Sequence, residues 1–269
     1  MIELFESDTV SFDRVSSKGN QLKWKSGDYW YKADSTGYEG LSEYVISSLL
    51  AKSTLKSDEY VLYEIEDIKY RNNVLSGCKS KNFLRDGEQL ITFNRLFMSQ
   101  YTENLTDIVF RIEEHEERLK YIVERIEIVT GIRDLGKYMA KCMTIDALFL
   151  NEDRHMHNIA LVLGKDGKYK TAPFFDHGAG LLSDTRMDYP LTGDVYEMIE
   201  YAEPKTFSES FDDQLDIAEK IYGRQIKFSF THRDVESILK KAEGHYSDRV
   251  IERVRTIVFE QMRKYSYMF

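Results

Sequence analysis

The stretch that most constrains the fold runs from Asn151 to Gly180, NEDRHMHNIALVLGKDGKYKTAPFFDHGAG. A polar loop precedes an apolar run over residues 159–163, a Gly-bearing turn over 164–167 and a second run over 169–175. Two such runs joined by a short turn are typical of a β-hairpin. Pro173 has no amide N–H to donate, so the second strand is expected to lie at a sheet edge there. Because a hairpin turns back on itself, the polar residues at its two ends are expected to be neighbours.

Those polar residues suit one kind of chemistry. Asp153 and Asn158 precede the hairpin, and Asp176 follows it. Phosphoryl transfer requires a divalent ion with oxygen ligands, a lysine on the nucleotide phosphates and a carboxylate that orients the attacking hydroxyl. We therefore predict that Asp153 faces the acceptor hydroxyl, while Asn158 and Asp176 supply oxygen ligands to Mg²⁺ bound with ATP.

The lysine is expected in the first third of the chain. Lys32 lies near the end of a predicted strand, which follows a hairpin turn at Ser26–Asp28. Residues 40–53 then show apolar side chains at the spacing of an amphipathic helix. Glu43 or Glu39 would hold Lys32 by an ion pair, and the pattern leaves the choice between them open.

The hydrophobic spacing changes along the chain from strand to helix. Strands are predicted over residues 21–24, 29–33 and 60–68, and residues 77–84 and 89–93 are expected to form either further strands or a connection between lobes. From Leu105 the spacing is helical, apart from the hairpin, and later helices are expected over 214–222, from Thr231 to Ala242 and from Ser247 towards Tyr265. We therefore predict an α+β protein with a mixed lobe over residues 1–102 and a helical lobe over residues 103–269.

The composition excludes several classes of protein. A net charge of −9, with 46 acidic residues, argues against binding nucleic acid through its phosphates. Cys78 and Cys142 have no metal-binding spacing and form no disulfide framework, which favours a reducing compartment. No basic, apolar leader and no run of about 18 apolar residues occurs, so we expect a cytoplasmic protein without a membrane span.

The loop also resembles a known family. The pattern D-R-H-x-x-N over residues 153–158, with an aspartate eighteen residues after the asparagine, is similar to the catalytic core of HipA-like kinases. The same signature occurs in phosphoinositide kinases, which are distant relatives within the protein-kinase-like fold. Residues 16–23 resemble the S-x-x-G-x-Q-x-K phosphate loop of that family, and Lys32 and Glu43 fall at its nucleotide lysine and helix glutamate.

This resemblance implies a two-lobed protein-kinase-like fold with a small antiparallel β-rich N-lobe and a larger, mainly helical C-lobe that carries the catalytic hairpin. It implies Mg-ATP binding between the lobes and transfer to a Ser or Thr of a protein substrate. The implied residues are Asp153 as catalytic base, His155 beside it, Ser16, Gly19, Lys32 and Glu43 around the nucleotide, and Asn158 and Asp176 on the metal. Ser16 is also a candidate for autophosphorylation.

The chain departs from the kinase pattern at two places. Its phosphate loop has a single glycine, and His177 stands where many protein kinases have phenylalanine. A pseudokinase that binds nucleotide and acts as an interaction module is one alternative. A second is a metal-dependent hydrolase in which His155, His157 and His177 bind zinc together with Asp176. A small-molecule acceptor in place of a protein is a third.

Overall fold

The computed structural model describes residues 1–9 and 21–269. Contacts divide these residues into two compact units. The first unit comprises residues 1–9, 21–83, 175–202 and 228–269, and the second comprises residues 84–174 and 203–227. Each unit therefore draws on distant parts of the chain. The expected lobe boundary near residue 102 stays a prediction.

The first unit contains a four-stranded antiparallel sheet in the order β2-β3-β7-β4. Its strands are β2 (Lys23–Ser26), β3 (Tyr29–Ala33), β7 (Gly77–Lys81) and β4 (Tyr63–Ile65). The expected hairpin turn between β2 and β3 is confirmed, with Gly27 at a φ of 56° that favours glycine. Lys32 lies opposite Cys78 on the central strand pair.

A second, smaller sheet in the same unit corrects one expectation. It has the order β1-β5-β6, with strands β1 (Ile2–Leu4), β5 (Ile68–Tyr70) and β6 (Asn73–Leu75). The single strand predicted over residues 60–68 is thus wrong, because β4 ends at Ile65 and β5 begins at Ile68 in a different sheet. Alternating side chains run across both pieces, so the break leaves little trace in the sequence pattern.

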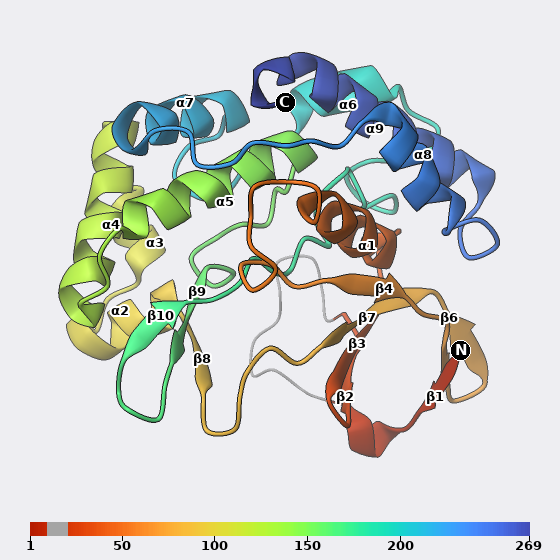
Figure 1. Cartoon of the computed structure of the whole chain (residues 1–269), viewed down its shortest axis with the longest axis horizontal. Helices are drawn as coiled ribbons and strands as arrows, with labels where there is room; N and C mark the ends of the chain where they lie inside the picture. The colour runs from red at the N-terminus through yellow and green to blue at the C-terminus, as the bar shows by residue number, and fades with distance from the viewer. Residues whose placement is uncertain (10–20) are drawn as a thin grey trace. The chain divides into compact units, whose positions relative to one another are not determined.

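Helix α1 (Glu39–Leu50) packs against β3, β7 and β4 (Figure 1). Its approach is close because Gly40 and Gly77 face each other. A Cβ atom at Gly40 would lie only 2.6 Å from the carbonyl carbon of Gly77. The absence of a side chain at Gly40 therefore lets the start of α1 lie directly on β7, and Glu43, one turn later, contacts Lys32 of β3.

Among its described residues, the first unit also contains the 3₁₀ turn η1 (Glu6–Asp8), the helices α6 (Val195–Tyr201), α8 (His232–Lys240) and α9 (Asp248–Lys264), and the 3₁₀ turn η2 (Ser266–Met268). The predicted starts of α8 and α9 are confirmed, whereas the helix predicted over residues 214–222 begins earlier, at Phe211. Thr231 accepts the Asp234 amide in a reciprocal capping box, and Ser247 accepts the Val250 amide. These caps satisfy amide groups that the first turn of a helix cannot pair itself.

The second unit combines a three-stranded antiparallel sheet with five helices among the described residues. The sheet has the order β10-β9-β8, with strands β8 (Gln89–Thr92), β9 (Ala160–Leu163) and β10 (Tyr169–Thr171). The helices are α2 (Phe93–Tyr101), α3 (Leu105–Val109), α4 (His115–Thr130), α5 (Leu135–Phe149) and α7 (Phe211–Tyr222). Helix α5 packs on both α4 and α7 (Figure 1).

The predicted hairpin of the opening stretch is confirmed as β9 and β10, paired with Leu161 opposite Thr171. Its second strand is shorter than expected, ending at Thr171 instead of Phe175. Pro173 follows two residues later, and proline cannot donate to a strand ladder. Within the described residues, no helix is long and apolar enough to cross a membrane.

Candidate functional site

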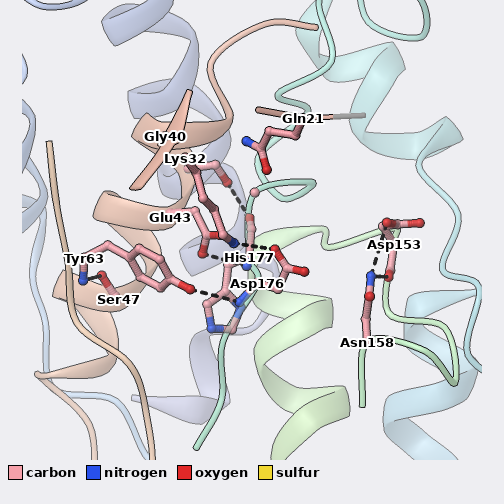
Figure 2. Close-up of polar contacts among 12 residues, drawn as sticks. Gln21, Lys32, Gly40, Glu43, Ser47, Tyr63, Asp153, Asn158, Asp176 and His177 are labelled. Atoms are coloured by element: carbon pink, nitrogen blue, oxygen red, sulfur yellow. Dashed lines mark hydrogen bonds and ion pairs between the residues drawn. The ribbon is translucent and has the colours of Figure 1, made fainter. Parts of the chain in front are cut away.

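Lys32 lies between two carboxylates in the first unit. Its Nζ atom is 2.5 Å from Glu43 Oε1 and 2.5 Å from Asp176 Oδ1. Figure 2 shows the lysine side chain pointing at both acids, one from α1 and one from the segment after the hairpin. Lys32 is 12% exposed, so the ammonium group is largely removed from water. An exposed lysine on an edge strand would not be held in this way, and β3 is an inner strand of its sheet.

Glu43 is the fixed partner of that lysine. The glutamate side chain is 1% exposed. Its Oε1 accepts from Lys32, and its Oε2 accepts from the His177 amide at 2.8 Å. Both carboxylate oxygens are thus bound, one to each of two separate segments of the unit.

Glu39 does not contact Lys32 in these hydrogen bonds but binds backbone amides, so Glu43 is the helix glutamate that pairs with Lys32. Its carboxylate accepts hydrogen bonds from the backbone amides of Ser35, Thr36 and Gly37. It also accepts from the Thr36 hydroxyl at 2.9 Å. Glu39 therefore closes the loop that leads into α1, while Glu43, one turn later, faces Lys32.

Asp176 sits in a segment that is bonded to α1 and β4. Its φ of 60° lies in the left-handed region, which aspartate tolerates better than most residues. Its amide donates to the Tyr63 hydroxyl at 3.4 Å. The Ser42 hydroxyl donates to the carbonyls of His177 and Gly180, at 2.8 and 2.9 Å. The backbone around Asp176 is therefore fixed, and its side chain is 25% exposed.

His177 is completely buried in this arrangement. Its amide donates to Glu43 Oε2, and its carbonyl accepts from the Ser42 hydroxyl. His177 therefore belongs to the packing between α1 and the segment that carries Asp176. A buried position is consistent with its place in the sequence, where many protein kinases have an apolar phenylalanine.

The charges of the three residues favour a protonated lysine. Burial lowers the pKa of Lys32, but Asp176 and then Glu43 more than offset that effect, and the pKa lies well above its usual value. Burial also raises the pKa of Glu43, against which Lys32 and the His177 amide act. With Lys32 positive and both acids ionised, the cluster carries a formal charge of +1 − 1 − 1 = −1.

The second unit holds the other predicted residues in one closed loop. The Asn158 side-chain amide donates to the Asp153 carbonyl at 2.7 Å and to Asp153 Oδ2 at 3.2 Å (Figure 2). The Asn158 backbone amide donates to the His155 carbonyl at 2.8 Å. His155 Nε2 lies 3.7 Å from Asp153 Oδ1. Because the Asn158 NH₂ group is used within the loop, its amide oxygen is the atom suited to a metal.

A buried ion pair that the sequence reasoning missed supports this loop. Arg154 Nε lies 3.2 and 3.1 Å from the two oxygens of Asp146, on α5. Arg154 Nη1 also donates to the Asn158 carbonyl at 3.2 Å, and the Asn151 amide donates to Asp146 at 3.0 Å. The available signal was Asp146 itself, an acid within the apolar run Ile145–Leu150. Buried acids are rare unless they are paired.

The structure thus brings the predicted residues together in two groups. Lys32, Glu43 and Asp176 meet in the first unit, and Asp153, His155 and Asn158 meet in the second. Asn158 and Asp176 belong to different units, so their expected proximity stays a prediction. The phosphate-loop residues Ser16 and Gly19 lie outside the described residues.

The donor atoms of Asn158 and Asp176 fit Mg²⁺, which prefers carboxylate and carbonyl oxygens. Among residues 1–9 and 21–269, no group of three or more His, Cys, Asp or Glu side chains is arranged to hold a metal ion. Protein sites for Mg²⁺ commonly use one or two carboxylates and complete the shell with substrate phosphates and water. The rings of His155 and His157 contact each other edge to face at 5.3 Å.

Comparisons with known proteins identify the fold. No family model matches this chain, and no curated protein matches it in sequence. Among solved structures, the chain is similar to the crystal structure of a Helicobacter pylori proinflammatory kinase, CtkA. The two share 18% sequence identity and a TM-score of 0.62 over 95% of this chain and 90% of that one. The chain therefore has a kinase-like α+β fold, with a small antiparallel sheet of four strands, two further three-stranded sheets and a larger helical part.

Proposed function

We propose that this protein is an ATP- and Mg²⁺-dependent kinase of the HipA-like type, which transfers the γ-phosphoryl group to a Ser or Thr of a protein substrate. The observation that carries the proposal is the buried lysine held between a helix glutamate and the aspartate after the hairpin. An ion pair between a strand lysine and a helix glutamate is the arrangement by which protein kinases place a lysine on nucleotide phosphates. The similarity to a solved kinase supports the same activity.

Each residue has a separate part in this proposal. Lys32 binds phosphate oxygens, and Glu43 fixes the direction of the lysine side chain. Asp153 accepts the proton of the substrate hydroxyl and orients that hydroxyl towards the phosphate. Asn158 and Asp176 supply oxygen ligands for Mg²⁺, which neutralises charge on the phosphates when it is bound with ATP.

The loop residues around Asp153 position it. His155 lies beside one Asp153 oxygen and Asn158 donates to the other, which limits the directions available to the carboxylate. Ser16 and Gly19 are proposed to cover the phosphates, with Ser16 as an autophosphorylation site. A cytoplasmic location is proposed as well, since Cys78 and Cys142 are buried free thiols, as is usual in a reducing compartment.

The test is transfer of label from ATP. Purified protein is incubated with labelled ATP and Mg²⁺, alone and with host-cell extract, beside the Asp153→Asn and Asp176→Asn variants. Wild type should label a protein on Ser or Thr. Asp153→Asn should retain nucleotide binding and lose transfer by about 10² or more. Asp176→Asn should instead weaken Mg²⁺-dependent nucleotide binding.

The outcome separates this proposal from its alternatives. A wild-type protein that binds Mg-ATP but transfers no more label than Asp153→Asn would be a pseudokinase. Label on a small molecule in the extract, and on no protein, would change the acceptor class. If wild type neither binds Mg-ATP nor transfers label, the kinase proposal is wrong.

A further inference from the structure

The two acids that hold Lys32 differ in how firmly they are held themselves. Glu43 is 1% exposed, and its second oxygen accepts the His177 amide at 2.8 Å. Asp176 is 25% exposed, and the contact of its Oδ1 with Lys32 is 2.5 Å. Lys32 therefore has one buried, anchored partner and one partner at the edge of solvent.

We propose that Lys32 occupies Asp176 in the nucleotide-free protein and thereby makes divalent-metal binding at Asp176 depend on nucleotide. This inference rests on the proposed function, because it takes Asp176 as a ligand of the metal. The oxygen that bonds Lys32 belongs to the carboxylate that the metal requires. An ammonium ion and a divalent cation at that carboxylate repel each other, and burial strengthens the repulsion.

Electrostatics favour the lysine as long as no phosphate is present. The cluster of Lys32, Glu43 and Asp176 has a formal charge of −1, so a divalent ion meets one net negative charge and a nearby cation. Among the residues that the structure describes, no group of three or more His, Cys, Asp or Glu side chains is arranged to hold a metal ion. A metal alone therefore finds a carboxylate that is already neutralised and few further ligands.

Nucleotide binding would change both the occupation of Asp176 by Lys32 and the number of ligands available to the metal. The lysine ammonium has three N–H donors, so it can keep Glu43 and exchange Asp176 for a phosphate oxygen. The exchange releases the Asp176 carboxylate, and the phosphates provide the metal with further oxygen ligands. Because linkage is reciprocal, the metal then strengthens nucleotide binding by the same factor.

The decisive measurement is the affinity for Mn²⁺ in the absence of nucleotide. The electron-spin-resonance signal of free Mn²⁺ reports how much of the ion is bound. Lys32→Met removes the competing cation and leaves the cluster at a formal charge of −2 (Glu43 and Asp176). This variant should bind Mn²⁺ alone about tenfold or more tighter than wild type. Adding Asp176→Asn to Lys32→Met should abolish the gain.

Two control variants separate this effect from net charge and from loss of fold. Lys79→Met removes a lysine from β7 of the same sheet, where it pairs with Glu66 and Glu64, and should leave Mn²⁺ affinity as in wild type. Lys32→Arg keeps the cation and should bind Mn²⁺ as weakly as wild type. If Lys32→Met does not fold, as judged by thermal unfolding, Lys32→Gln takes its place.

The inference is overturned if the neutral Lys32 variants bind Mn²⁺ no tighter than wild type, or if the gain survives Asp176→Asn. It is also overturned if Lys79→Met gives the same gain. None of these measurements requires phosphoryl transfer. A protein that shows the Mn²⁺ pattern but transfers no label would retain this inference about Lys32 and contradict the proposed enzymatic activity.

Discussion

The Glu43 side chain is buried and contacts Lys32. We therefore expect it to affect ligand binding through that lysine. Glu43 and Glu39 are one helical turn apart, yet the first bonds Lys32 and the second bonds backbone amides at residues 35–37. A carboxylate that fixes a lysine affects ligand binding, whereas one that closes a loop affects mainly stability. The two glutamates thus form a matched pair for mutation.

Glu43→Gln should weaken ATP affinity by about tenfold, because an amide holds the Lys32 ammonium less firmly than a carboxylate does. Glu39→Gln should leave ATP affinity within about twofold and lower the free energy of unfolding by about 1 kcal/mol, as for a lost helix cap. Isothermal titration with ATP and Mg²⁺, together with denaturant unfolding, measures both effects. Equal losses of ATP affinity in the two variants would contradict the separate roles.

Asp34, which precedes α1, makes stability depend on pH. Its Oδ1 accepts the Gly40 amide at 2.6 Å. Burial raises the pKa of Asp34 to about 7; Glu39 adds to the rise, whereas the Gly40 amide and Tyr246 oppose it. Because the pKa in the folded protein lies above the unfolded value, the folded state binds the proton more tightly. The free energy of unfolding should therefore fall as pH rises from about 4 to about 7 and level off above that.

As the pH rises from 5 to 8, ionisation of Asp34 should lower the free energy of unfolding by roughly 2–3 kcal/mol. Asp34→Asn keeps an oxygen for the Gly40 amide and cannot ionise, so its unfolding free energy should lack that part of the decline. Urea unfolding of both proteins at the two pH values provides the comparison. An unchanged pH dependence in Asp34→Asn would show that another group titrates.

Among the elements, α1 depends most on close contact with the sheet. Gly40→Ala would place a Cβ atom 2.6 Å from the Gly77 carbonyl carbon, against backbone that cannot rotate away. We expect α1 to move from β7, with a loss of about 1–3 kcal/mol in unfolding free energy. Weaker ATP binding should accompany that loss, since Glu43 moves with the helix.

Gly193→Ala is a suitable control for that variant. Its Cβ atom would meet the end of the flexible Met198 side chain, which can change rotamer. This variant should unfold within about 1 kcal/mol of wild type and bind ATP unchanged. If Gly40→Ala bound ATP as wild type does while losing stability, the position of α1 would not control the lysine.

Elements with local signals could be predicted from the sequence, and those set by tertiary contacts could not. The β2–β3 turn has Gly27, and α8 and α9 have Thr231 and Ser247 at their starts, where side chains bond the first amides. No local pattern marks the break between β4 and β5, which pair in different sheets. Nor does one reveal that the arginine next to Asp153 pairs with an acid on α5.

The same distinction holds for the candidate site. The loop over residues 153–158 is a short motif, and its internal hydrogen bonds connect residues within five positions of each other. The contact of Lys32 with Asp176 spans 144 positions and depends on the folding of the whole first unit. Spacing alone also could not choose between Glu39 and Glu43, which are four apart and share one side of a helix.

At the scale of the whole molecule, the chain has a kinase-like fold at 18% identity to a solved kinase. The functional prediction at this scale is linkage between ligand and stability. A ligand that binds only the folded state adds about 2.7 kcal/mol when its free concentration is 100 times its dissociation constant. For a protein of 269 residues, this corresponds to a rise in Tm of roughly 5–10 °C.

Mg-ATP at saturation should therefore raise the Tm by that amount, whereas ATP with EDTA and Mg²⁺ alone should each give a much smaller shift. The reason is the proposed linkage: Lys32 contacts Asp176 without nucleotide, and on that proposal the metal binds well only after phosphate has taken the place of Asp176 on the lysine. Differential scanning calorimetry of wild type and Asp176→Asn measures the difference. In the variant, the shift with Mg-ATP should fall to that with ATP and EDTA. Equal shifts with and without metal in wild type would show that nucleotide binding does not involve a metal at Asp176, and that Lys32 acts on the phosphates alone.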